Sequence, residues 1–348
     1  MGRKNVYIRV DGNLKIGMGH IMRCIALGQG FRIEGFEVTF ITIAYDKETI
    51  GRIEYEGFPV KILNQRCSFD LRLDLRETLN LLPVDTEFSL VVTDGYKFDQ
   101  FYQQGIKEKG YPLMCIDDIA NTHFYADVVL NQNINANSVY YSKEPYTVLL
   151  LGTKYALIRE EFLKYRRFER HFPEKAKNIL LSLGGGDPEN HTLKILQALE
   201  LLNDKSLNVN VLVGLANPNI ETLRKFVKNS KMKFTILSNT PKMPELLKEA
   251  DLSISAAGTT TWELCLLGLP GIVGILAENQ VGIANGLEEY GAFNSIGWFR
   301  DAPSEKVAKA IKWLVENKTL RSQMSRKGKQ LVDGLGVERV VNEIDKRI

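Results

Sequence analysis

A histidine follows a pair of glycines where the first apolar run of the chain gives way to an amphipathic stretch. Gly17 and Gly19 precede His20, and Arg23 follows about one helical turn later. Glycines at a strand-to-helix turn let the backbone approach a ligand closely, and the first N–H groups of the helix attract anions. We therefore expect His20 and Arg23 to face a ligand, together with Asp11 at the end of the apolar run. The alternative is a helix start that merely exposes its histidine.

Three successive glycines follow another apolar run in the second half of the chain. Gly184 and Gly185, with Gly186, come directly before Asp187 and Pro188. Each glycine raises the entropy of the unfolded chain, so packing alone is a weak reason for three of them. Asp187 and Pro188 are typical of an N-cap and of the first residue of a helix. We interpret the segment as a capped helix start whose glycines also approach a ligand.

Small and hydroxyl-bearing residues form a third turn. Gly258, Thr259 and Thr260 begin a predicted helix, and Glu263 lies in its first turn. Backbone N–H groups and threonine hydroxyls at a helix N-terminus are suited to a diphosphate. The carboxylate of Glu263 can accept hydrogen bonds from the paired hydroxyls of a ribose. Glutamate at this place also caps helices and complements their dipole, which is the alternative.

Amide side chains follow the next apolar run. Asn279 and Gln280 can donate hydrogen bonds to a sugar or a phosphate, whereas an ordinary N-cap at Asn279 is the alternative. All four turns follow apolar runs that read as strands. In doubly wound sheets, ligands bind outside the carboxyl ends of the strands, so these turns are the candidate binding loops.

The spacing of residues excludes several familiar sites. Met22 occupies the place of the third glycine in a dinucleotide fingerprint, and no Walker A lysine, zincin HExxH, hydrolase elbow or EF-hand loop occurs. Asp117 and Asp118 are adjacent at a strand end, where neighbouring side chains point in opposite directions, so a shared metal ion is not expected. The cysteines are too scattered for a disulfide scaffold or a zinc site: Cys24, Cys67, Cys115 and Cys265. We expect neither a metal ion nor a cofactor.

Continuous apolar runs alternate with amphipathic stretches throughout the chain, which predicts parallel sheets covered by helices on both faces. In the first half the predicted strands are residues 6–10, 37–43, 59–63, 89–93 and 112–116, and the helices 21–31, 70–82 and 98–109. In the second half the strands are residues 178–183, 208–213, 234–237, 252–255 and 272–275, and the helices 189–202, 219–229, 243–249, 260–267 and 280–290.

A polar, charge-dense stretch near residues 155–177 separates the two halves. We therefore predict two Rossmann-like, doubly wound parallel-sheet domains, residues 1–160 and 161–348, with a cleft between them. The tail from residue 304 reads as helical with a break near 333–336, so its last helix is free to cross back.

Composition narrows the class of protein. The 348 residues carry 45 Lys and Arg against 42 Asp and Glu, a net charge of +3 that is too small to favour nucleic acid. Hydrophobic residues make up 44%, which is usual for a globular chain and leaves no reason to expect disorder. The start of the sequence resembles neither a signal peptide nor a membrane anchor, so we expect a cytoplasmic enzyme without a membrane span.

The chain resembles the UDP-2,4-diacetamido-2,4,6-trideoxy-β-L-altropyranose hydrolases of pseudaminic acid biosynthesis (PseG type), which are relatives of the inverting GT-B glycosyltransferases. The similarity runs through most of the chain and is most specific in GMGHIMR and GTTTWELCLLGLP. The other matching segments are VVTDGY, CIDDIA, ADVVLNQN, LLGTKYALIREEF and LLSLGGGD.

This resemblance implies a GT-B-like fold and hydrolysis of a UDP-linked 2,4-diacetamido-2,4,6-trideoxyhexose to UDP and free sugar, without a metal ion. It makes His20 the catalytic base that activates water, and it places Tyr96 and Asn279 near the sugar. It also implies that the loops of the second domain, with Glu263, bind UDP.

Two other functions stay open. An inverting GT-B glycosyltransferase would move the sugar to a hydroxyl acceptor, and a nucleotide-sugar-binding protein would perform no catalysis. A membrane-associated transferase often carries a basic stretch in its first domain. Residues 164–167 (KYRR) with Arg170 are the candidate, although a solvated helix face explains them better.

Overall fold

The computed structural model describes residues 4–12, 17–43, 47–64, 69–84, 89–214, 217–238, 240 and 242–347, apart from the side chain of Glu48. Cys67 and four residues of the first glycine turn, 13–16, lie outside the described residues. The chain divides into two compact units. The first unit is Met1–Glu160 with Gly334–Ile348, and the second unit is Glu161–Asp333.

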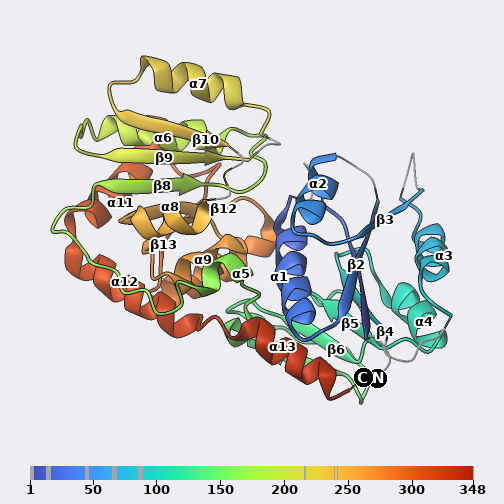
Figure 1. Ribbon diagram of the computed structural model, residues 1–348. Coiled ribbons are helices and arrows are strands. Elements are labelled where there is room, and N and C mark those ends of the chain that lie inside the picture. The colour runs from blue at the N-terminus through green and yellow to red at the C-terminus, as the bar shows by residue number, and fades with distance from the viewer. Residues whose placement is uncertain are drawn as a thin grey trace. The chain divides into compact units, whose positions relative to one another are not determined.

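The first unit is built on a parallel sheet that, in the described residues, has seven strands in the order β3-β2-β1-β4-β5-β6-β7. Helices cover both faces of this sheet (Figure 1). Along the chain its elements are β1 (Asn5–Val10), α1 (Gly19–Ile33), β2 (Glu37–Ile43), α2 (Lys47–Tyr55), β3 (Val60–Leu63), α3 (Leu71–Leu81), β4 (Ser89–Asp94), α4 (Gln100–Glu108), β5 (Leu113–Ile116), β6 (Val128–Asn131), β7 (Val148–Leu151) and α13 (Gly336–Asp345).

Alternation along β1 sorts its side chains between two cores. Val6, Ile8 and Val10 belong to the core that α1 and α13 cover, whereas Tyr7 packs against the core on the α3 and α4 side. The strand order reverses between β1 and β4, which pair in parallel from Asn5 opposite Ser89 to Val10 opposite Asp94. The carboxyl ends of these two strands are therefore the topological switch point of the first unit.

The helix α13 lies beside α1, although some 300 residues separate them in sequence (Figure 1). A Cβ built on Gly30 of α1 would stand 2.1 Å from Cγ1 of Val337, so only glycine permits this close approach. At the start of α13, a Cβ on Gly336 would stand 2.2 Å from the carbonyl oxygen of Ala156. The tail is thus an integral part of the first unit.

The second unit has a parallel sheet of six strands in its described residues, in the order β10-β9-β8-β11-β12-β13, with the switch point between β8 and β11. Its elements are α5 (Glu160–Leu163), β8 (Asn178–Ser182), α6 (His191–Leu201), β9 (Asn208–Val213), α7 (Ile220–Asn229), β10 (Lys233–Ser238), α8 (Met243–Glu249), β11 (Leu252–Ala256), α9 (Thr260–Leu266), β12 (Gly271–Ile275), η3 (Glu278–Gln280), α10 (Val281–Tyr290), β13 (Asn294–Trp298), α11 (Ser304–Glu316) and α12 (Lys318–Leu331).

The predicted fold class, two Rossmann-like units with parallel sheets, is confirmed. The sequence analysis did not predict α2, nor the strands β6, β7 and β13. These strands are four or five residues long, and β3 and β5, which were predicted, have four residues each. At this length a periodic pattern does not reliably distinguish a strand from an apolar loop segment.

Candidate functional site

The imidazole of His20 meets a carboxylate at the switch point of the first unit. His20 lies in the first turn of α1, and β4 ends at Asp94. Nδ1 of His20 is 2.6 Å from Oδ1 of Asp94, and no described residue bonds its other ring nitrogen, Nε2. The side chain is largely buried, with 8% of the residue exposed.

Arg23 holds the same carboxylate. Its Nε donates to Oδ2 of Asp94 at 2.7 Å and its Nη2 to Oδ1 at 2.6 Å, a bidentate ion pair in which both side chains are buried. Burial by itself would raise the pKa of Asp94, but Arg23 and His20 outweigh it and hold that pKa well below its usual range. Asp94 is therefore ionised at neutral pH.

Arg23 also reaches a second carboxylate, that of Asp118, with Nη1 at 3.3 Å from Oδ2. In the structure, Arg23, which the sequence predicts to face a ligand, pairs with two carboxylates. Asp118 and its neighbour Asp117 have separate partners, since Asp117 accepts hydrogen bonds from the backbone N–H groups of Ile119 and Ala120.

Tyr96 completes this group of side chains. Its ring stands edge-on to the ring of His20, with centroids 5.2 Å apart and an interplanar angle of 81°. It is 37% exposed. Burial raises the pKa of Tyr96, and a hydrogen bond to Asp118 adds to this, so the phenol stays protonated.

Asp11 belongs to a neighbouring buried network rather than to this group. Arg9 Nη1 donates to its Oδ1 at 2.7 Å, as does the backbone N–H of Ile43 at 2.8 Å, and Lys97 pairs with its Oδ2. Burial would raise the pKa of Asp11, but Arg9 and Lys97 hold it well below the usual range. Lys97 directly follows Tyr96, so Asp11 anchors the loop that carries the tyrosine. Its contact with substrate stays a prediction.

The backbone conformation explains a glycine at position 17 of the first turn. Gly17 has φ +81°, a left-handed conformation that side chains rarely adopt. Gly19 is the first residue of α1, whose N-cap residue, Met18, makes no side-chain cap hydrogen bond. Among the described residues, the N-cap therefore gives the N-terminal amides of α1 no side-chain acceptor, although such an acceptor usually satisfies one of them.

The glycine turn after β8 is explained in part by packing. Gly184 has φ +96°, and a Cβ on Gly214 would stand 2.1 Å from the carbonyl oxygen of Gly185. The predicted N-cap is wrong in position, because α6 begins at His191 and not directly after Asp187. The carboxylate of Asp187 still accepts from the backbone N–H groups of His191 at 2.8 Å and Thr192 at 2.7 Å. This carboxylate already occupies the start of α6.

The helix start in the turn after β11 has fewer side-chain hydrogen bonds than the start of α6. Thr259 is the N-cap of α9 without a side-chain cap hydrogen bond, and the next residue, Thr260, begins the helix. Helix geometry leaves the first N–H groups without intrahelical acceptors. A Cβ built on Gly258 would stand 3.8 Å from Nε2 of Gln280, so the two residues are neighbours. Because Oε1 of Gln280 accepts from the backbone N–H of Leu276 at 2.9 Å, its amide nitrogen is oriented toward this turn.

Two further predicted residues flank the turn after β11. Glu263 is buried in the first turn of α9, and Asn279 is exposed in η3, beside Gln280. The structure thus brings Gly258 and Gln280 together in the second unit, and His20, Arg23 and Tyr96 together in the first. That these two groups of residues act on one ligand stays a prediction.

The sequence analysis missed Asp94 and the role of Asp118. Asp94 was available as a signal, because it ends an apolar strand and precedes a glycine. Its importance depends on the fact that β4 is a neighbour of β1 in the sheet. The order of the strands along the sequence does not predict this, because β2 or β3 could occupy that position equally well.

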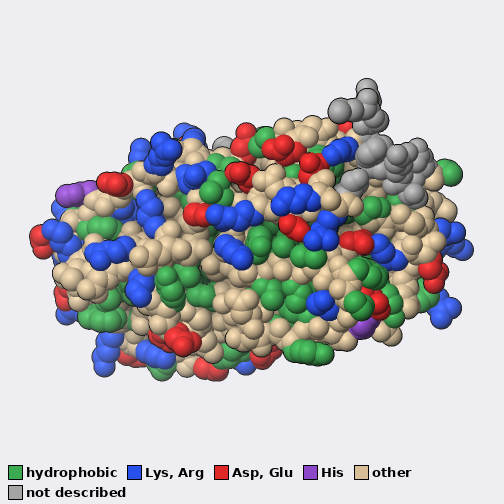
Figure 2. Space-filling model, turned by 90° about the horizontal axis from the view of Figure 1, so that it is seen from below, with side chains coloured by type: hydrophobic (Ala, Val, Ile, Leu, Met, Phe, Trp, Pro, Cys, Tyr) green, Lys and Arg blue, Asp and Glu red, His purple; other side chains and the backbone are tan. Residues whose placement is uncertain are grey.

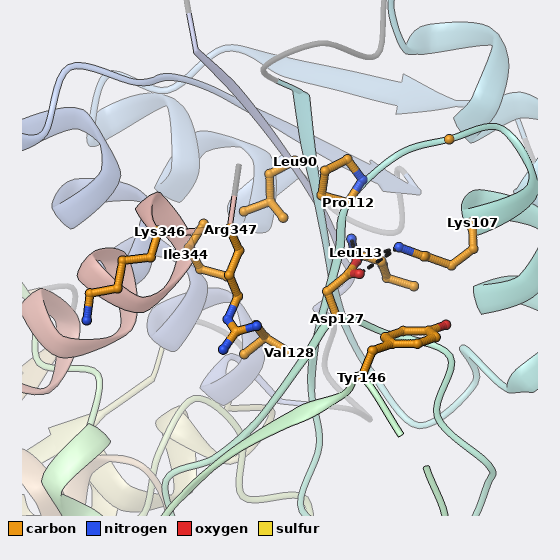
Figure 3. Close-up of a pocket in the computed structure, with 11 residues that line it drawn as sticks. Leu90, Lys107, Pro112, Leu113, Asp127, Val128, Tyr146, Ile344, Lys346 and Arg347 are labelled. Atoms are coloured by element: carbon orange, nitrogen blue, oxygen red, sulfur yellow. Dashed lines mark hydrogen bonds and ion pairs between the residues drawn. The ribbon is translucent and has the colours of Figure 1, made fainter. Parts of the chain in front are cut away.

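A cavity of about 420 Å³ lies at the opposite edge of the first unit's sheet, where β4, β5 and β6 begin (Figure 3). Lys107, which lines it, is paired with Asp127 at 2.6 Å, and Arg347 with Glu343 at 2.7 Å. None of the predicted site residues line it. Its cations are satisfied and it lies away from the strands' carboxyl ends, so it is not the candidate site.

Among the described residues, no three His, Cys, Asp or Glu side chains are grouped so as to hold a metal ion. Within the same residues, no helix combines the length and apolar character needed to cross a membrane. On the face shown in Figure 2, Lys and Arg side chains are interspersed with Asp and Glu.

Comparison with known proteins agrees with the observed fold. The fold is GT-B-like. Solved structures that resemble the chain include MurG of Acinetobacter baumannii (TM-score 0.67, 17% identity, 99% of each chain) and MnaA of S. aureus with UDP (TM-score 0.69, 16% identity, 99% of this chain and 97% of that one). At this identity the likeness shows the fold alone.

Residues 185–336 match the family described as the glycosyltransferase family 28 C-terminal domain. An uncharacterised protein of Methanocaldococcus jannaschii is 32% identical over 79% of this chain, which covers 56% of that protein. The spore coat polysaccharide biosynthesis protein SpsG of Bacillus subtilis is 27% identical over 97% of this chain and 96% of its own length. A third relative, from Helicobacter pylori, is 27% identical over 63% of this chain and 39% of its own length. Its name is pseudaminic acid cytidylyltransferase and UDP-2,4-diacetamido-2,4,6-trideoxy-beta-L-altropyranose hydrolase.

Proposed function

We propose that the chain hydrolyses a UDP-linked 2,4-diacetamido-2,4,6-trideoxyhexose to UDP and free sugar, in the biosynthesis of a pseudaminic-acid-type sugar. The observation that carries the proposal is the His20 imidazole, bound to an ionised Asp94 at the carboxyl edge of the sheet with Nε2 unbonded by any described residue. An imidazole can accept a proton near neutral pH, as activation of water requires.

The relatives support the nucleotide-sugar part of this proposal. The Helicobacter protein carries the hydrolase in its name, and the Bacillus relative is named for polysaccharide biosynthesis. Structures of the same fold include one with UDP from S. aureus and one with UDP and glucose from Anabaena.

In the proposed reaction, the oxygen of a water molecule forms a bond to the anomeric carbon while the bond from that carbon to the UDP oxygen breaks. His20 Nε2 takes one proton from the water, and the electron pair of the broken bond stays on the β-phosphate. General base catalysis of this kind contributes typically about 10²–10⁴-fold to a rate. Tyr96, beside His20, and Asn279 would contact the sugar.

The second unit would bind the nucleotide. The amides of Thr259 and Thr260 would donate to the diphosphate and would stabilise the charge that grows on the leaving group. The N–H of Gly258 already donates to the carbonyl oxygen of Ala256 at 2.8 Å, so Gly258 would serve by letting the backbone approach the ligand closely. Gln280 would add its amide N–H, and Glu263 would accept from the ribose hydroxyls. Gly184 and Gly185 would give the backbone room near the ligand.

An inverting glycosyltransferase is the second candidate. The match of residues 185–336 to a glycosyltransferase family favours it, as does the likeness of the fold to a rhamnosyltransferase with its aglycone (TM-score 0.64). The two functions differ only in whether water or a hydroxyl attacks the anomeric carbon.

The test is incubation of the purified chain with UDP-sugars and no acceptor, followed by assay of UDP and of reducing sugar. Release of both in equal amounts is the expected result. Binding without release in buffer, but release once hydroxyl acceptors are added, would replace the hydrolase with a transferase. Binding without release under both conditions would indicate a non-catalytic binding protein.

The nucleotide site has its own test. Glu263→Ala should raise the KM for the UDP-sugar about tenfold or more and leave kcat within a few-fold, because a lost hydrogen bond between a charged and a neutral group is worth about 1.5–3 kcal/mol. Glu249→Ala, at an exposed position of the same unit, is the control. An unchanged KM for Glu263→Ala would favour the helix-capping alternative.

A further inference from the structure

Asp94 has a geometric relation to His20 that determines which ring nitrogen carries the proton. Its Oδ1 is 2.6 Å from Nδ1 of His20, a distance that requires one hydrogen between the two atoms. The hydrogen belongs to Nδ1, because Arg23 and His20 hold the pKa of Asp94 far below neutrality in spite of its burial. The neutral ring therefore has its lone pair on Nε2.

The carboxylate of Asp94 contacts only buried side chains of the described residues. Arg23 supplies two donors to the carboxylate, and the thiol of Cys24 lies 3.3 Å from Oδ2. Arg23 Nη2 is also 3.0 Å from Nδ1 of His20, but a guanidinium only donates, so Oδ1 of Asp94 is the acceptor that both groups share. The side chain of Asp94 has no exposed surface, so it acts through the imidazole.

We infer that Asp94 is a positioning residue that fixes His20 as the Nδ1–H tautomer and stabilises the imidazolium that forms when Nε2 accepts a proton. Arg23 acts through Asp94, as the cation that keeps it ionised, and not as a ligand of the phosphates. This inference rests on the proposed function for its kinetic consequence only, since the tautomer is a property of the free protein.

Asp94→Asn is the variant that separates this role from simple packing. Asparagine offers a single acceptor oxygen, whereas both Oδ1 and Oδ2 of Asp94 accept from Arg23 and Oδ1 also accepts from His20. Either orientation of the amide sets its NH₂ against a donor of Arg23 and leaves no anion beside Nδ1 to stabilise the imidazolium that forms when Nε2 takes a proton from water. We expect kcat to fall on the order of 10²–10⁴-fold, with KM and the Kd for UDP changed less than threefold.

The direct readout is the tautomer of His20, from long-range ¹H–¹⁵N spectra of the full chain labelled at histidine, with His20→Asn to assign the signals. The expected result is the Nδ1–H tautomer in the native chain. Asp118→Asn is the matched control, because Asp118 also binds Arg23 but does not bond His20, and it should keep the Nδ1–H tautomer.

An Nε2–H tautomer in the native chain would overturn the inference whether or not the protein turns over a UDP-sugar. So would Asp94→Asn with native kcat. Conversely, the expected tautomers in a protein that releases no UDP would refute the proposed function and leave the positioning role of Asp94 intact. Because the native-chain spectrum does not depend on Asp94→Asn, instability of that variant does not remove the test.

Discussion

At the scale of single residues, the proposed chemistry depends on one imidazole. His20→Asn should retain UDP binding and lose about 10²–10⁴-fold in kcat, because asparagine cannot accept the proton from water. Steady-state kinetics and calorimetric titration with UDP measure the two effects separately. His123→Asn is the control, since His123 lies in the same unit but is partly exposed and bonds Ser142 and Glu144. Near-native kcat in His20→Asn would remove His20 from the mechanism.

Asp117 is a buried acid whose ionisation opposes folding. Burial raises its pKa to about 6 and neighbouring Asp118 adds to the shift, although hydrogen bonds from Ala120 and Ile119 oppose it. Between about pH 4 and pH 6 the unfolded chain releases this proton before the folded chain does. The first unit therefore loses stability as pH rises through this window, by roughly 2–3 kcal/mol when the change is complete.

Asp117→Asn should remove this loss, because asparagine keeps an oxygen for the two backbone N–H groups and does not ionise. Its melting temperature relative to the native chain should rise between pH 4 and pH 7, as measured by thermal unfolding at both values. Asp301→Asn, an exposed acid of the second unit, should show no such change. A difference that stays constant with pH would contradict the assignment.

Single residues also show where the sequence is informative. His20 and the turn after β11 are candidates from the sequence because glycine and hydroxyl residues before a helix form a local pattern. Asp94 was not predicted, because its importance comes from the pairing of β4 with β1. The spacing of residues along the sequence does not reveal such long-range pairing. The same limit applies to Arg23, whose carboxylate partners come from two other strand ends.

At the scale of elements, Arg170 joins the ends of two helices of the second unit. Its guanidinium donates to the carbonyl oxygens of Leu247 at 2.8 Å and Lys248 at 3.2 Å in α8, and to that of Gly268 at 3.1 Å just after α9. Carbonyls at helix C-termini lack intrahelical donors and carry partial negative charge, which a cation stabilises. The sequence analysis grouped Arg170 with a basic surface cluster, whereas the structure gives it this internal role.

Arg170→Met should keep the packing of the side-chain stem and lose its donors. We expect the second unit to lose about 2–4 kcal/mol, equivalent to a fall in melting temperature of roughly 5–10 °C. Arg167→Met is the matched control, because Arg167 is exposed three residues earlier in the same segment. Equal melting temperatures for the two variants would show that the carbonyl contacts carry no net stability.

Prediction of elements succeeded for most of the longer ones and was uneven for the others: β3 and β5 were predicted, whereas β6, β7 and the amphipathic α2 were not. The bounds of β2, β9 and α8 agree with the expected residues 37–43, 208–213 and 243–249. α6 begins two residues later than expected, because Asp187 caps the helix from outside and not as its N-cap. This difference removes α6 from the helix starts that are open to a phosphate.

At the scale of the whole molecule, the first unit is not contiguous in sequence. Its final helix, α13, buries Val340, Val341 and Ile344 in the core shared with α1, at a position that Gly30 makes possible. Full burial of one such side chain stabilises a fold by about 1.5–3 kcal/mol, so three together contribute roughly 5–9 kcal/mol as an upper estimate. That sum is comparable with the whole stability of a typical domain.

Deletion of residues 334–348 should therefore unfold the first unit, although none of its sheet is removed, while the second unit keeps its own core. Limited proteolysis with mass spectrometry should then show rapid cleavage within residues 1–160 and persistence of a fragment near 161–333. Deletion of residues 346–348 alone leaves α13 in place and should change little, because Lys346 and Arg347 are exposed. If the longer deletion left residues 1–160 as resistant as in the full chain, α13 would be an accessory and the sheet with α1 would be self-sufficient. The expected outcome would instead show that α13 is needed to position His20. This residue lies at one end of α1, and the same helix packs against α13 along its length.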